Sequence, residues 1–428
     1  MKWALGLLFV TAAALWLFTA RPEPVPPGVT VLRYMAWGNP EQLAAEQELI
    51  DEFTRRHPAI RVKLTLVPGS AYYQKLQVML ASGTAPDVFR CDHYQFPAYA
   101  QRGYFLPLDE FVQRDPDFRY ADYFDQVIEE GRHAGRFYGV NTLFGARVIY
   151  YNKDLFARAG LTDPYVLYRR GEWTVEQFLD AAQRLTVTGH NGIVEQFGVL
   201  VHPLEVWTFA WGFGGEILTP DGSRCVADQP GTVQALQFLR DLRHRWHVTP
   251  TPAENALSAY TFESGRIAMV FDWAGAAPRY RQHIRNFDWD IVSIPSGPAG
   301  RHPMLKGNQL LIYRQTRAPE AAWQFLKFYV SRDAEALLCG RLRRAMTTRR
   351  DLAAAEEYLR SDRPPRQNDV WIDQYAIGRP LPITARWSDW QAEWNRAFEL
   401  LMLNRLSPEE MAREAATRIN AILAEEPY

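Results

Sequence analysis

Residues 29–92 alternate between two kinds of hydrophobic pattern. Residues 29–37 are rich in β-branched and aromatic side chains, which is typical of a buried strand. Apolar residues at positions 43, 49, 50 and 53 then recur at helical spacing, and residues 60–66 alternate apolar with polar side chains, as a strand does. A second helical stretch over 70–80 and a short apolar run at 88–89 follow. The pattern predicts strand, helix, strand, helix, strand.

The ends of these predicted strands indicate a ligand site. Strands and helices that alternate in this way form parallel α/β sheets, in which ligands bind beyond the carboxyl ends of the strands. Trp37 and Asn39 follow one strand, and Asp92 and Tyr94 follow another. An aromatic ring, an amide, a carboxylate and a phenol at one edge could hold a polyhydroxylated ligand. The alternative is that Trp37 belongs to the core and Asp92 caps a loop.

Composition narrows the class of protein. The chain has 428 residues, enough for two or three domains. Its net charge of −1, with both signs interspersed, lacks the basic footprint of a nucleic-acid-binding protein. Its 14 tryptophans suit stacking against flat ligand faces as well as core packing. Cys91, Cys225 and Cys339 are too few for a disulfide scaffold and are predicted to be separate buried thiols, although one bridge stays open.

The N-terminal residues 1–28 predict export. A single lysine precedes residues 3–20, which are almost wholly apolar, as in a secretory signal. This run is nearly long enough to span a bilayer, so a cleaved signal and an uncleaved membrane anchor both remain open. Residues 22–27 then form a proline-rich spacer. The folded part is therefore predicted to lie in the periplasm or at the extracellular face of the cytoplasmic membrane.

Several later segments occur in the order found in one known family. The chain resembles the extracellular solute-binding proteins of ABC importers, and within them the sugar-binding family that includes the maltodextrin-binding protein. Each motif is weak alone, but together they cover residues 29–331. The segments that carry the resemblance are 84–89 (TAPDVF) with 100–103 (AQRG), 150–160 (YYNKDLFARAG), 171–179 (GEWTVEQFL) with 181–186 (AAQRLT), 207–215 (WTFAWGFGG) with 218–222 (LTPDG), 235–242 (ALQFLRDL), 262–269 (FESGRIAM), 287–297 (FDWDIVSIPSG) and 320–328 (EAAWQFLKF).

The resemblance implies a fold and a mechanism. The expected class is α/β, with the type II periplasmic-binding-protein fold: two lobes, a hinge of crossing strands and a ligand cleft between the lobes. The first lobe would comprise residues 29–140 with 276–315, and the second 141–275 with 316–428. The hinge strands would fall near 139–150 and 269–275. Closure of the cleft around a carbohydrate would then present the protein, as a monomer, to the permease subunits of an ABC importer.

Sugar chemistry and the resemblance together select candidate ligand-binding residues. Sugar hydroxyls need planar donors and acceptors, and the C–H faces of a sugar need aromatic rings. Trp273 departs from the family pattern, which more often places a glycine before this tryptophan. The candidates are Trp37, Asn39, Asp92 and Tyr94 on the first lobe, Trp207, Trp211, Trp273 and Trp390 on the second, and Asn308 in the turn after Gly307.

Three other functions stay open at this point. A secreted glycosidase would need two carboxylates at a fixed separation, and no local motif singles out such a pair. A polyol or glycerol-phosphate binder would need a cation, for which Arg147 is the one nominated. The third alternative is an exported scaffold without a small ligand. Serine-elbow, phosphate-loop and zinc-helix motifs are absent from the sequence, so no catalytic residue, metal ligand or cofactor is predicted.

Overall fold

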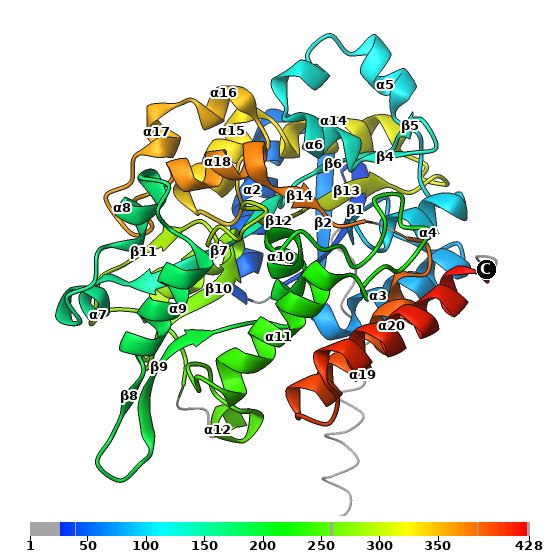
Figure 1. The fold of residues 1–428 in the computed structure, drawn as a ribbon. Coiled ribbons are helices and arrows are strands. Elements are labelled where there is room, and N and C mark those ends of the chain that lie inside the picture. Colours follow the sequence, from blue (N-terminus) through cyan, green and yellow to red (C-terminus); the bar gives the residue numbers. More distant parts are fainter. Residues whose placement is uncertain (1–25, 39, 257–259, 383, 426–428) are drawn as a thin grey trace, which may run out of the picture.

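The computed structural model describes residues 26–38, 40–256, 260–382 and 384–425, and it has two lobes (Figure 1). Each lobe is built around its own β-sheet. The predicted export segment lies outside the described residues. Within the described ranges, no helix has the length and apolar character that crossing a membrane requires.

The first sheet has the strand order β2-β1-β3-β13-β6. Its parallel part is β1 (Thr30–Trp37), β2 (Ile60–Val67) and β3 (Val88–Asp92), with α2 (Pro40–Arg56) and α3 (Gly69–Ala81) as the connecting helices. This confirms the order of elements that the hydrophobic pattern predicts. Leu49 and Phe53 of α2 are fully buried, as the helical spacing requires, whereas Leu43 is exposed. The antiparallel strand β13 (Asn308–Ile312) inserts between β3 and β6 (Gly139–Asn141).

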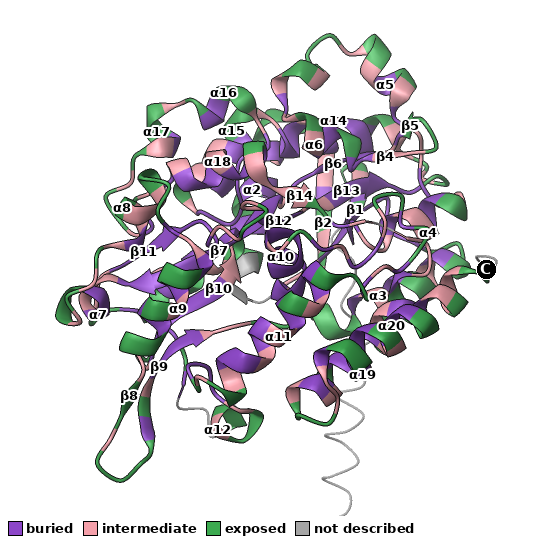
Figure 2. Ribbon diagram, viewed as in Figure 1, coloured by how far each residue is buried: buried purple, intermediate pink, exposed green. Residues whose placement is uncertain are grey.

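The second sheet is organised around β7 (Gly145–Asn152), every residue of which is buried. One edge of β7 pairs with β10 (Ile267–Trp273), and its other edge pairs with β11 (Trp289–Val292) and β12 (Met304–Lys306). β9 (Val194–Leu200) lies beside β10, β8 (Val187–Thr188) beside β9, and β14 (Arg379–Pro380) beside β12. Figure 2 shows that buried residues concentrate in the strands, while the outer helices present exposed faces.

The chain passes between the two sheets three times among the described residues. Two of these crossings are short, and the third runs from β13 to β14 through residues 313–378. The first crossing, at 142–144 between β6 and β7, lies inside the predicted hinge segment 139–150. The second crossing is at Gly307, between β12 and β13, and not at the predicted 269–275. The reason is that β11 and β12 both pair with β7 before the chain leaves the second sheet. The prediction assigned these two strands to the first lobe.

The helix α14 (Pro319–Tyr329) also differs from the predicted assignment, because it contacts α2, β1 and β13 of the first lobe. The predicted lobe limits otherwise stay a prediction. The long helices α19 (Trp387–Met402) and α20 (Pro408–Leu423) pack on α11 of the second lobe, and all three cysteines are free and buried. The remaining elements are α4 (Phe96–Gln101), α5 (Asp109–Arg114), η1 (Tyr120–Asp122), α6 (Asp125–Glu129), β4 (Arg132–His133), β5 (Arg136–Phe137), α7 (Lys153–Arg158), α8 (Pro164–Arg169), α9 (Val175–Arg184), α10 (Glu205–Gly212), α11 (Pro230–His244), α12 (Pro252–Ala256), η2 (Ala274–Ala276), α13 (Ala277–His283), α15 (Arg332–Glu335), η3 (Ala336–Arg341), α16 (Arg350–Ala353), α17 (Glu356–Leu359) and α18 (Asp369–Ile377).

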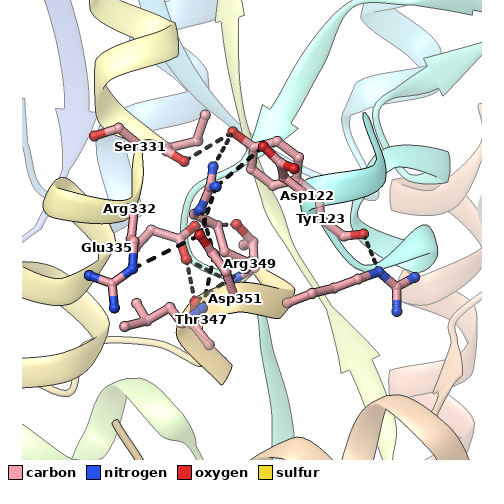
Figure 3. A network of polar contacts seen from close by, with 12 residues as sticks. Asp122, Tyr123, Ser331, Arg332, Glu335, Thr347, Arg349 and Asp351 are labelled. Atoms are coloured by element: carbon pink, nitrogen blue, oxygen red, sulfur yellow. Dashed lines mark hydrogen bonds and ion pairs between the residues drawn. The ribbon is translucent and has the colours of Figure 1, made fainter. Parts of the chain in front are cut away.

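A buried carboxylate attaches the chain after α15 to the first lobe (Figure 3). Glu335 accepts hydrogen bonds from the Thr347 hydroxyl at 2.5 Å and from the Thr348 backbone N–H at 2.9 Å. Burial raises the pKa of Glu335 to about 7, and these hydrogen bonds offset the effect only in part. The next residue, Arg349, pairs with Asp122 of the first lobe at 3.4 Å. The network thus fixes the segment that leads to α16.

Candidate functional site

A cavity of about 580 Å³ lies where the two short crossings meet. Leu143 and Phe144 of the first crossing line it, as do Lys306 and Asn308 on either side of Gly307. The carboxyl end of β1 adds Trp37 to the wall, and the end of β10 adds Trp273. Residues of both sheets therefore enclose the cavity, and a ligand bound there would touch both lobes.

Lys306 connects the two sides of this cavity. Its Nζ lies 3.0 Å from Asp92 Oδ1, 4.6 Å from the ring centroid of Tyr94 and 5.7 Å from that of Trp273. Both distances allow a cation–π attraction. The Tyr94 hydroxyl donates a hydrogen bond to Asp92 Oδ2 at 2.5 Å. The ammonium group thus joins a first-lobe carboxylate to aromatic rings on both lobes.

A buried charge network supports the first-lobe wall. Glu46 Oε1 lies 2.5 Å from Arg90 Nη2 and 2.8 Å from Arg344 Nη1. Burial alone would raise the pKa of Glu46, but the two guanidinium groups outweigh it and hold this pKa at about 2. The Arg90 guanidinium lies 5.7 Å from the Trp37 ring centroid, and Tyr72 meets the same ring edge-on at 4.9 Å. These contacts fix the orientation of the Trp37 indole.

A second ion pair supports the opposite wall. The Arg147 guanidinium lies 5.2 Å from the Trp273 ring centroid and pairs with the buried Glu205. Burial raises the pKa of Glu205, and the charge of Arg147 offsets this only in part. Arg147 also donates a hydrogen bond to the Phe271 carbonyl oxygen at 2.8 Å. Because Arg147 is buried and bound to Glu205, it is not the free cation that the glycerol-phosphate alternative nominated.

The lobes also touch each other beyond the cavity. The Tyr94 ring stacks on Trp387 of α19, with a centroid distance of 5.5 Å and an interplanar angle of 15°. The adjacent Gln95 donates a hydrogen bond from Nε2 to Ser388 Oγ at 3.2 Å. Both contacts join the first lobe to a helix that packs on the second, so the described conformation has the lobes in contact.

The predicted ligand-binding residues fall into separate groups. Trp37, Trp273 and Asn308 line the cavity, and Asp92 and Tyr94 contact its Lys306. The structure does not bring the other three tryptophans to this cavity, because they are buried in the second lobe; Asn39 lies outside the described residues. The three are Trp207, Trp211 and Trp390.

These three tryptophans form one aromatic cluster. The Trp207 ring lies 5.7 Å from Trp211 and 6.4 Å from Trp390. Trp211 donates its indole N–H to Glu216 at 2.8 Å, and Trp390 donates its own to Thr384 at 2.9 Å. Trp207 and Trp390 line a second hollow of about 490 Å³ between α10, α11 and α19. The contacts of the three tryptophans are those of packed core residues.

Sequence reasoning missed the charged residues of the cavity. Lys306, Asp272, Arg279 and Arg344 all line it, and none was a candidate. Lys306 could have been chosen from the sequence, because it stands directly before the predicted turn at Gly307. Trp387 was also missed, although it begins the tryptophan repeat on α19 that contains Trp390.

Acidic groups are few on the cavity wall. Within the described parts of the chain, Asp272 is the one carboxylate among its lining residues, whereas a glycosidase needs two. The same parts contain no group of three or more His, Cys, Asp or Glu residues that could hold a metal ion. The arrangement is suited to binding.

Comparison with known proteins identifies the class. Residues 37–336 match the family model described as bacterial extracellular solute-binding protein. The chain belongs to this family. Members of the solute-binding family are binding proteins, so the finding agrees with the sequence resemblance and does not favour the glycosidase alternative.

Relatives of this solute-binding protein are distant but cover its length. A putative binding protein of Brucella abortus is 23% identical, and the alignment covers 99% of this chain and 98% of the relative. A maltotriose-binding protein of Pyrococcus abyssi is 21% identical over 70% of this chain and 62% of the relative. An ABC substrate-binding protein of Listeria monocytogenes, solved in complex with cycloalternan, has a TM-score of 0.82 and 24% identity, covering 93% of this chain and 100% of that one. This structural likeness establishes the type II periplasmic-binding-protein fold.

Proposed function

We propose that this solute-binding protein is the exported receptor of an ABC importer and that it captures a carbohydrate in the cavity between its lobes. The observation that supports the proposal best is the composition of the cavity wall. Trp37 and Trp273 offer indole faces from opposite lobes, and Asn308 offers an amide beside them. Aromatic faces suit the C–H surfaces of a sugar, and the amide suits its hydroxyls.

The known relatives support the same class of ligand. The similar proteins of Pyrococcus abyssi and Listeria monocytogenes are a maltotriose-binding protein and a protein in complex with cycloalternan. Both ligands are carbohydrates of several sugar units. The cavity volume of about 580 Å³ lies within the usual range for small-molecule sites and has room for a saccharide.

The mechanism would be a change in the balance between open and closed lobes. A ligand shifts such an equilibrium only by as much as it binds one state better than the other. A saccharide in contact with Trp37 and Trp273 would stabilise the closed state, because it bridges the lobes. The closed monomer would then dock on permease subunits, and ATP hydrolysis would occur in a separate subunit. Export through residues 3–20, as a cleaved signal or as an anchor, belongs to the same proposal.

A thermal-shift screen tests the proposal. The bound saccharide should raise the melting temperature, because binding to the folded state alone adds RT ln(1 + [L]/Kd) to stability. Trp273→Ala should reduce the affinity roughly tenfold or more, since it removes one aromatic face. Trp246→Ala is the matched control, because Trp246 is also half-buried but packs on Phe238, away from the cavity. If no saccharide shifts the melting temperature of the wild type, the receptor proposal fails.

A further inference from the structure

Cations outnumber anions on the inner surface of the interlobe cavity. Lys306, Arg279 and Arg344 line it, and Asp272 is the one lining carboxylate among the described residues. Each of these cations has an anionic partner: Asp92 for Lys306, Glu46 for Arg344, and Asp272 and Glu263 for Arg279. The nitrogen–oxygen distances are 3.0 Å for Lys306–Asp92 and 2.8 Å for Arg344–Glu46. For Arg279 they are 3.2 Å to Asp272 and 2.9 Å to Glu263.

In every one of these pairs the cation is the more exposed partner. The Lys306 side chain is 20% exposed and that of Asp92 is 9% exposed. The Arg279 side chain is 54% exposed, against 25% for Asp272. Glu46 is fully buried beneath Arg344. The cations are therefore the more accessible partners, and of the four carboxylates Asp272 is the one that lines the cavity wall among the described residues.

Two histidines have lowered pKa values: His93 next to Asp92, and His202, which lines the second hollow. Burial and, to a smaller extent, the positive charge of Lys306 lower the pKa of His93 to about 3, and Asp92 opposes them more weakly. Burial likewise lowers the pKa of His202 to about 4, with Arg147 as the second cause and Asp272 as the weaker opposing one. At both positions the cation acts more strongly than the carboxylate of the same region.

We propose that the saccharide carries an anionic group, a carboxylate or a phosphate, and that the Lys306 ammonium binds it. The inference rests on the proposed carbohydrate receptor and names its class of ligand. An ammonium has three N–H donors, and the ion pair with Asp92 occupies one of them. Trp273 and Tyr94 flank Nζ, so the sugar ring beside the anionic group would meet an aromatic face. Arg279, exposed on the same cavity, supplies a second cation.

The test uses the full folded chain and three panels of probes. The panels are neutral oligosaccharides such as maltotriose, oligogalacturonates, and hexose phosphates, compared by thermal shift and by titration calorimetry. We expect a hit among the charged panels, with an affinity that falls as salt rises from 20 to 300 mM. A hit among oligogalacturonates assigns a carboxylate, and a hit among hexose phosphates assigns a phosphate.

Three variants then locate the contact. Lys306→Gln should weaken binding of the charged probe by about 10- to 100-fold, the range of a hydrogen bond to a charged group. Lys63→Gln removes the same charge from an exposed position on β2 and should leave the affinity unchanged. Asp92→Asn should preserve or tighten binding of a charged probe, because it frees Lys306. A neutral sugar that uses the Asp92 carboxylate would lose affinity in the same variant.

The results distinguish a wrong class of ligand from a wrong receptor function. If a neutral saccharide binds as tightly as its charged counterpart, or if Lys306→Gln behaves like Lys63→Gln, the anionic class is wrong and the carbohydrate receptor stands. If no member of any panel binds, the carbohydrate receptor itself is wrong. Weaker binding of the charged probe by Asp92→Asn would also contradict an anionic ligand.

Discussion

At the scale of single residues, burial and polar partners decide what an indole can do. Trp273 is half-buried and lines the cavity, whereas Trp211 is 2% exposed, with its N–H bound to Glu216 and the Arg379 guanidinium 4.6 Å from its ring centroid. Trp211 lies in a segment that resembles the family and Trp273 departs from the family pattern, yet both were candidates on the sequence. The sequence motif could therefore not separate them, because the difference lies in contacts between distant elements.

Glu335 provides a prediction about pH. Its pKa is raised from an ordinary value of 4.5 to about 7 by burial, so the folded protein holds this proton more tightly than the unfolded chain does. The stability from Glu335 is therefore complete below about pH 4.5 and is lost as the pH rises to about 7, by roughly 3 kcal/mol. In Glu335→Gln, urea unfolding between pH 4.5 and 8 should show a flatter profile than in the wild type.

Glu130→Gln is a second test of the same prediction. Burial raises the pKa of Glu130 to about 7 as well, and its carboxylate accepts a hydrogen bond from Asn141 at 3.0 Å. Each single variant should remove part of the pH dependence, and the double variant should remove more. Identical profiles for the wild type and Glu335→Gln would contradict the assigned role.

The ion pairs of Lys306 and Arg344 at the candidate site could not be predicted from the sequence either, because the partners are far apart in the chain. Arg344 and Glu46 are 298 positions apart in the chain. Lys306 ends a strand of the second sheet, whereas its partner Asp92 ends a strand of the first. No local spacing encodes either contact. Trp37, Trp273 and Asn308 could be predicted from the sequence, because each ends or directly follows a strand or turn that the local pattern predicts.

At the scale of elements, the second crossing is built tightly around a glycine. A Cβ atom at Gly307 would lie 1.9 Å from Asn141 Oδ1 on β6. Asn141 cannot easily move, because its side chain donates to Glu130 and to the Val127 carbonyl oxygen. The close approach of the crossing to β6 thus depends on the missing side chain.

Gly307→Ala should therefore lower the free energy of unfolding by about 3 kcal/mol or more, since overpacking at a rigid contact is costly. Gly340→Ala is a matched control, because nothing lies within 4 Å of a Cβ placed at Gly340. Thermal melting of the two variants under the same conditions measures the difference. Equal melting temperatures would show that Asn141 can be displaced at little cost.

The elements themselves were predictable where their partners are close in sequence. The alternation from β1 to β3 follows from local hydrophobic periodicity, and the structure reproduces it. The pairing of β11 and β12 with β7 was not predictable, because the apolar run at 287–295 fits either lobe. The position of the second crossing at Gly307 depends on that pairing.

At the scale of the whole molecule, a small aromatic contact joins the lobes in addition to the contacts of Lys306 at the cavity. The stack of Tyr94 on Trp387 and the hydrogen bond from Gln95 to Ser388 are the described links between β3's loop and α19. An aromatic pair contributes about 0.5–1.5 kcal/mol beyond its area, which changes a population of closed molecules by a few-fold. This contact is therefore strong enough to bias the lobes toward closure but too weak to hold them closed by itself.

Trp387→Ala should shift the ligand-free protein toward open lobes. Small-angle X-ray scattering should report a larger radius of gyration than in the wild type, and saturating ligand should reduce this difference. Trp246→Ala, remote from the contact, should scatter like the wild type. Unchanged scattering in Trp387→Ala would mean that other contacts hold the lobes together.

The place of β13 in the first sheet has a consequence for how the molecule is made. β6 is the end strand of that sheet and pairs with β13, while β13 separates it from β3. During synthesis the ribosome must therefore release residues up to 312 before the sheet can close. The first sheet stays incomplete while most of the chain is synthesised, so the first lobe cannot finish folding from its N-terminal segments alone.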